Sequence, residues 1–103
     1  MSNRFDKNRS DRTDDFFYSI LMLKNKNECY DFFEDLLTVN ELQSIAQRYT
    51  VAKLLKSGMT YQQIEEATGA SSATISKVSQ SLNYGKGGYD IAISRLEKKK
   101  AEF

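Results

Sequence analysis

Apolar residues recur along this chain at the three- and four-residue spacing of helices. No stretch shows the sustained alternation of Val, Ile and Thr that is typical of a strand. The sequence also contains no proline, the residue that interrupts helices most strongly. The pattern therefore predicts an all-α protein with helices throughout.

Two helices are predicted in the N-terminal third. The first, at about 14–24, begins with Asp14 and Asp15, since acidic residues favour a helix N-terminus, and it is too apolar all round for a surface helix. The second, at about 28–37, has Asn27 as its expected cap. Its apolar positions, which are expected to face the core, are Cys29, Phe32, Phe33, Leu36 and Leu37.

The longest helix is expected to run from Thr38 to near Gly58. Thr38 and Glu41 have the spacing of a capping box, in which side chains and backbone amides at a helix start bond reciprocally. An apolar stripe at helical spacing follows, formed by Leu42, Ile45, Ala46, Tyr49, Ala52 and Leu55.

Residues 60–82 predict two short helices joined by a tight turn, the arrangement of a helix-turn-helix. Thr60 and Gln63 repeat the capping-box spacing, Gly69 suits a positive φ, and Ser71 or Ser72 can cap the second helix at about 72–82. The positions that lock such a pair together are filled by Ile64, Gly69, Ala70, Ile75 and Val78. Two positions depart from the usual pattern, with Glu65 in place of a small residue and Thr68 in place of Leu.

A last helix is predicted over 89–99, after the glycine-rich run 85–88. Tyr84 and Tyr89 flank that run, and we expect both to pack against the core rather than to stack on a nucleobase.

Once the core face of the second short helix is fixed, its polar face must point outward. In a helix-turn-helix this helix enters the major groove, where short hydroxyl and methyl groups allow close approach to base edges. The predicted base-reading residues are Ser72, Ala73, Thr74, Ser76, Lys77 and Gln80. Phosphate contacts must come largely from elsewhere, because residues 59–83 carry one lysine against two glutamates. The predicted phosphate-binding residues include Arg48, Lys53, Lys56 and Thr60.

Composition narrows the function further. The 103-residue chain contains no histidine, which excludes histidine-based acid–base catalysis and His-containing zinc sites, so we expect no enzyme, no metal and no cofactor. Six Phe and six Tyr in so short a chain need more burial than a small monomer offers, which favours an oligomer. The alternative to DNA binding is a helical protein–protein interaction module that binds no DNA.

The chain is expected to form one helical domain over 14–100, preceded by a disordered arm at 1–13 in which only Met1 and Phe5 are apolar. No stretch is long and apolar enough to predict a membrane span, and the polar N-terminus is unlike a signal peptide. A single cysteine, Cys29, fits a reducing compartment. The expected location is therefore the cytoplasm.

Three stretches together resemble the Trp repressor superfamily, and most closely its Trp repressor-related YerC/YecD family. They are LLTVNELQSIAQRYTVAKLL, GMTYQQIEEATGASSATIS and SLNYGKGGYDIAI. The resemblance spans about 14–96 and implies a six-helix fold, an intertwined homodimer with interlocked N-terminal helices, and binding to double-stranded DNA at an approximately palindromic operator. It also places Gln62 and Asn83 at positions that are basic in the repressor, which implies that these two residues are phosphate-binding as well.

The resemblance further implies a pocket for a small effector, in which the repressor binds tryptophan. Thr38, Arg48 and Ser81 match pocket positions of the repressor. Lys77 replaces an arginine that packs on the indole ring, and Val78 replaces a glycine that leaves room for that ring. We therefore expect no strong tryptophan binding, and the identity of any effector is left open.

Overall fold

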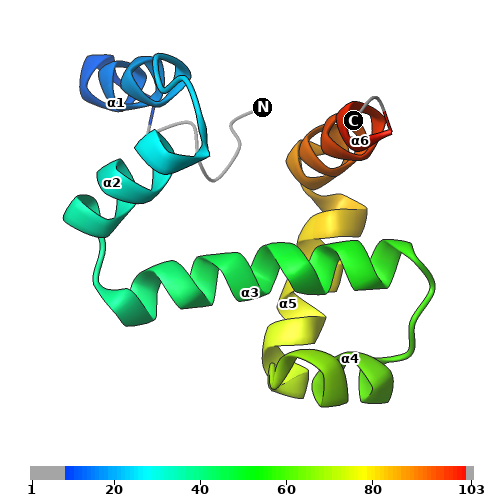
Figure 1. Cartoon of the computed structure of the whole chain (residues 1–103). Coiled ribbons are helices and arrows are strands. Elements are labelled where there is room, and N and C mark those ends of the chain that lie inside the picture. The colour runs from blue at the N-terminus through cyan, green and yellow to red at the C-terminus, as the bar shows by residue number, and fades with distance from the viewer. Residues whose placement is uncertain (1–8, 102–103) are drawn as a thin grey trace. The chain divides into compact units, whose positions relative to one another are not determined.

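The computed structural model describes residues 9–101, and the regular structure within that range consists of six helices (Figure 1). The chain divides into two compact units that adjoin at Val39 and Asn40. The first unit contains α1 (Asp11–Leu21) and α2 (Lys26–Leu36), and the second is built on α3 (Val39–Lys56), α4 (Tyr61–Thr68), α5 (Ser72–Tyr84) and α6 (Gly88–Lys100). The predicted all-α class is confirmed.

Both helices of the first unit begin earlier than predicted, because each is capped by a polar residue upstream of the predicted start. The Thr13 amide donates to Ser10 Oγ at 3.3 Å, so α1 starts at Asp11 rather than near Asp14. Residues 1–8 of the predicted arm lie outside the described residues. Asn25, not Asn27, caps α2 by accepting from the Glu28 amide at 2.9 Å.

In the first unit, residues 9–39 make aromatic contacts, but none of them is buried. The rings of Phe16 and Phe32 lie 6.2 Å apart between centroids, and neither α1 nor α2 has a buried side chain. Cys29 is exposed, so its predicted place in a core is wrong for the single chain. The exposed large apolar side chains of α1, α2 and the residue after α1 are Phe16, Phe17, Tyr18, Leu21, Met22, Tyr30 and Leu36.

The second unit has a continuous apolar core to which all four of its helices contribute. Figure 1 shows α5 crossing α3, with α4 and α6 joined to the two ends of α5. The buried core residues are Val51, Ala52, Ile64, Ala70, Ile75, Val78 and Ile93. The apolar stripe predicted on α3 was expected to be buried. Ala52 is buried, but Ile45 is 51% exposed, so the prediction is wrong at Ile45. Only the C-terminal half of α3 supplies buried side chains.

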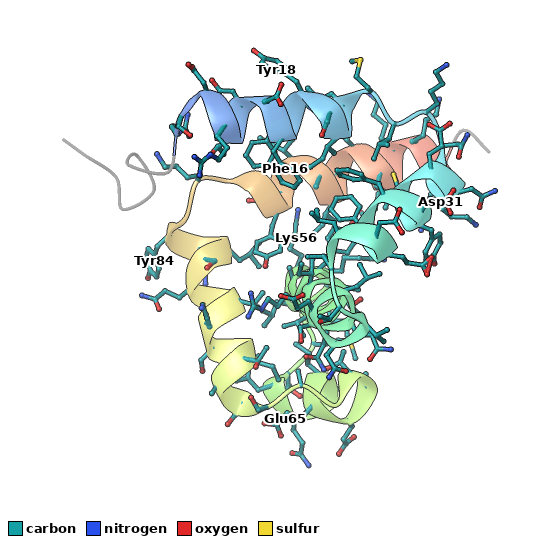
Figure 2. The ribbon with its side chains drawn as sticks, turned by 90° about the vertical axis from the view of Figure 1, so that its left-hand side faces the viewer. Phe16, Tyr18, Asp31, Lys56, Glu65 and Tyr84 are labelled. Carbon is teal, nitrogen blue, oxygen red and sulfur yellow. The ribbon has the colours of Figure 1, made fainter. Side chains whose placement is uncertain are left out.

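The turn between α5 and α6 separates two tyrosines with different environments. Tyr89 packs against the core as predicted, whereas Tyr84 is 85% exposed and points away from the ribbon in Figure 2. The prediction that Tyr84 packs is therefore wrong, since it is the last residue of a helix whose buried face ends before it. At the start of α6, Asp90 Oδ1 forms an ion pair with Lys56 Nζ of α3 at 2.9 Å.

Candidate nucleic-acid interface

The first helix of the predicted helix-turn-helix is fixed at both ends by local hydrogen bonds. The Gln63 amide donates to Thr60 Oγ1 at 3.2 Å, and the Thr60 amide donates to Gln63 Oε1 at 2.9 Å, which confirms the capping box. At the other end Gly69 adopts φ 73° and ψ 4°, and its amide donates to the Glu65 carbonyl at 2.9 Å. This left-handed conformation is one that glycine adopts without steric cost, so the chain can turn sharply into α5.

The second helix begins at Ser72 with Ser71 as its cap. The Thr74 amide donates to Ser71 Oγ at 3.1 Å, and the Ser71 hydroxyl donates in turn to Thr74 Oγ1 at 3.1 Å. Ile75 and Val78 are buried one turn apart and hold the opposite face of α5 on the core. The start of α5 is thus positioned by the hydrogen bonds between Ser71 and Thr74 and by two buried aliphatic side chains.

Five of the six predicted base-reading residues are exposed on α5. Thr74 is half-buried, because its side chain turns back to Ser71 at the helix start. Its predicted role in base reading stays a prediction. The exposed set of short and flexible polar side chains consists of Ser72, Ala73, Ser76, Lys77 and Gln80.

The predicted phosphate-binding residues differ in their availability. Arg48 is exposed on α3 and Lys53 is half-buried near the end of that helix, while Lys56 is paired with Asp90. Asp90 would compete with phosphate for Lys56, whose predicted role in binding phosphate stays a prediction. Figure 2 shows Glu65 of α4 pointing outward, which adds negative charge to the helix-turn-helix surface.

The three polar phosphate candidates lie at helix ends and are all exposed. Thr60 caps α4 and Gln62 lies in the first turn of that helix. Asn83 lies in the last turn of α5, where its amide nitrogen donates to Ser79 Oγ at 3.4 Å. These side chains supply hydrogen-bond donors but no charge.

Members of the predicted effector pocket lie in both compact units. Thr38 precedes α3 in the first unit, whereas Arg48 lies on α3 and Lys77, Val78 and Ser81 lie on α5. Val78 is only 2% exposed and belongs to the core cluster. Its isopropyl group therefore occupies space within packed protein, and a ligand would have to displace it.

A polar contact that the sequence does not indicate joins α3 to the turn of the helix-turn-helix. Gln47 Nε2 donates to the Thr68 carbonyl at 3.1 Å, across 21 residues of sequence. The two residues lie in a shallow hollow between α3 and α4 whose lining is Gln43, Ala46, Gln47, Thr50, Ala67 and Thr68. No local motif could have predicted the bond, because its geometry depends on how α3 packs against α4.

Within residues 9–101 the structure offers neither a metal site nor a membrane-spanning segment. Among these residues, no group of three or more Cys, Asp or Glu side chains is placed so that it could hold a metal ion. None of the described helices combines the length and apolar character needed to cross a lipid bilayer.

A helix-turn-helix carried on this six-helix fold defines a Trp repressor-like protein. The sequence profile of the family described as Trp repressor protein matches residues 11–97, so the chain belongs to the Trp repressor family, a family of regulators. The resemblance inferred from the sequence is confirmed.

Relatives in three bacteria share both sequence and fold with this chain. YerC of Bacillus subtilis strain 168 is 50% identical over 99 residues, which cover 96% of this chain and 95% of YerC. A Trp repressor-like crystal structure from Staphylococcus aureus has a TM-score of 0.90 and 48% identity, covering 93% of this chain and 96% of that one. A TrpR-like protein from Eubacterium eligens ATCC 27750 has a TM-score of 0.86 and 50% identity, covering 88% and 94%.

Proposed function

We propose that this protein is a homodimeric transcriptional repressor that reads duplex DNA through α4 and α5 and catalyses no reaction. The observation that carries the proposal is the start of α5, where Ser72, Ala73 and Ser76 are exposed on a helix held rigidly from behind by Ile75 and Val78. Small side chains at this position allow the helix backbone to come close to base edges in the major groove.

Assembly into a homodimer is supported by the first unit. Tyr18, Leu21 and Met22 are each at least 66% exposed, and no residue of α1 or α2 is buried. An uncovered surface of this kind is typical of a protein interface, because leaving large apolar side chains in water is unfavourable. A symmetric dimer would present two copies of α5 to successive turns of the major groove, roughly 34 Å apart.

Affinity for phosphate is expected to be moderate. Arg48, Lys53 and Lys77 of each copy are the cations that we assign to DNA, while Lys56 is engaged with Asp90. Neutral donors such as Gln62 and Asn83 can still bond phosphate oxygens without releasing counterions. Sequence selectivity should therefore depend on base contacts from α5.

The competing proposal is a module whose exposed apolar surfaces bind another protein and which binds no DNA. Selection of duplexes from a random pool by the purified full-length protein separates the two. We expect enrichment of an approximately palindromic sequence with two half-sites about one helical turn apart. A pool that remains random after repeated rounds would reject sequence-specific DNA binding.

We expect no micromolar binding of tryptophan. Val78 is packed with the core where the ligand ring would need space, and protein cores tolerate added volume poorly. Titration calorimetry with tryptophan should give no saturable heat below about millimolar concentration, where a Kd of 1 mM corresponds to about 4 kcal/mol of binding free energy. Saturation at micromolar tryptophan would show that the pocket is intact despite Val78.

A further inference from the structure

The turn between α4 and α5 is held by a set of hydrogen bonds that converge on Thr68. The Thr68 hydroxyl donates to the Ile64 carbonyl at 2.7 Å and accepts from the Ala70 amide at 3.1 Å. The Thr68 carbonyl accepts from Gln47 Nε2 at 3.1 Å. We call the side chains of Gln47 and Thr68 the turn clamp, because together they bond the backbone on both sides of Gly69.

The turn clamp acts on the segment that fixes the angle between the two helices. Carbonyls in the last turn of a helix lack partners within the helix, and Gln47 supplies one for Thr68. The Ala70 amide, which follows the left-handed Gly69, receives its partner from the Thr68 hydroxyl. A leucine at position 68 could make neither of the side-chain bonds, since it carries no hydroxyl.

The clamp also connects the turn to a rigid support. Gln47 lies on α3, whose residues Val51 and Ala52 are completely buried in the core one turn further along. α4 is only eight residues long, with a single buried side chain, Ile64. Packing alone therefore leaves the end of α4 weakly held, and the bond from Gln47 restrains the backbone just before α5.

We propose that Gln47 and Thr68 are positioning residues that set the orientation of α5 and thereby determine how selectively the protein reads DNA. This inference rests on the proposed function. Neither side chain needs to touch a base, because the effect is transmitted through the Thr68–Ser71 backbone to the start of α5. Because each bond is a part-buried hydrogen bond of modest net energy, its loss should loosen the turn without unfolding the domain.

The test compares Gln47→Met and Thr68→Val, which remove clamp bonds while keeping side-chain size. Thr68→Ser restores the hydroxyl and serves as the rescue variant. Gln43→Met is the matched control, since Gln43 lines the same hollow one turn earlier and its amide takes no part in the clamp. Using Gln47→Met beside Thr68→Val keeps the test informative if one variant folds poorly.

Two measurements are made on the full-length proteins. Amide hydrogen exchange at Ala70 should speed up about tenfold in Gln47→Met and Thr68→Val, with core amides such as that of Val78 unchanged. The ratio of affinities for the selected duplex and a scrambled duplex should fall about tenfold in the same two variants, and Thr68→Ser and Gln43→Met should keep the wild-type ratio.

The outcomes separate the clamp from the proposed function. Unchanged exchange at Ala70 in both variants would overturn the clamp. Faster exchange with undiminished selectivity, in a wild-type protein that does select its duplex, would overturn the positioning role alone. A wild-type protein that does not distinguish the two duplexes would reject the proposed function and this inference with it.

Discussion

A Phe17→Asp variant is expected to be monomeric at concentrations where the wild-type protein forms the proposed dimer. Phe17 is 57% exposed on α1 in the single chain, among other uncovered apolar side chains. Burying one large apolar side chain contributes about 1.5–3 kcal/mol, and a symmetric dimer loses that contribution twice. The dissociation constant of the dimer, measured by sedimentation, should rise at least about 100-fold.

Asn27→Asp is the control for that variant. It adds the same negative charge at an exposed polar position in the first turn of α2, where an acid is tolerated. This variant should remain dimeric. If Phe17→Asp sedimented as the wild-type protein does, the apolar surface of α1 could not be the dimer interface.

An Ala73→Asp variant is expected to lose DNA binding while keeping its stability. Ala73 is exposed in the first turn of α5, where a carboxylate interacts favourably with the helix dipole by about 0.3–1 kcal/mol. The same carboxylate would face phosphates and base-edge acceptors at short range, and it would compete with the DNA for Lys77, one turn further along α5. Affinity for the selected duplex, measured by fluorescence anisotropy, should fall at least about 100-fold, equivalent to about 2.7 kcal/mol.

The matched control is Ala101→Asp, which makes the same exchange at an exposed position beyond the end of α6. It should bind DNA within about a factor of two of the wild-type protein, as expected for a single distant charge in salt. The melting temperature of Ala73→Asp should be equal to or slightly above that of the wild-type protein. Unchanged affinity in Ala73→Asp would place the DNA surface somewhere other than the start of α5.

Local signals in the sequence predicted the helix-turn-helix well. Capping residues and turn glycines act over three or four residues, so Thr60 with Gln63, Gly69 and Ser71 could be identified without knowledge of the fold. In the first unit the same reasoning selected the wrong one of two nearby asparagines as the helix cap, since Asn25 rather than Asn27 caps α2. The DNA-contacting roles assigned to α5 stay predictions.

Features that depend on distant contacts could not be predicted from the sequence. The Lys56–Asp90 ion pair joins residues 34 positions apart, and the Gln47–Thr68 bond joins residues 21 apart. Apolar periodicity also does not say what covers an apolar face, so Ile45 and Cys29 were assigned to a core although the single chain leaves them exposed. A pattern that serves an interface between chains looks the same as one that serves an internal core.

The central claim is that this protein binds duplex DNA through a small set of cations and recognises its sequence with α5. Titrating the selected duplex at several salt concentrations tests this claim most directly. With Arg48, Lys53 and Lys77 of both copies as candidates for phosphate, about four to six neutralised phosphates predict a slope of log K against log salt of roughly −3.6 to −5.4. A slope near zero, with the duplex still bound, would show that phosphate neutralisation does not drive binding and would contradict the account.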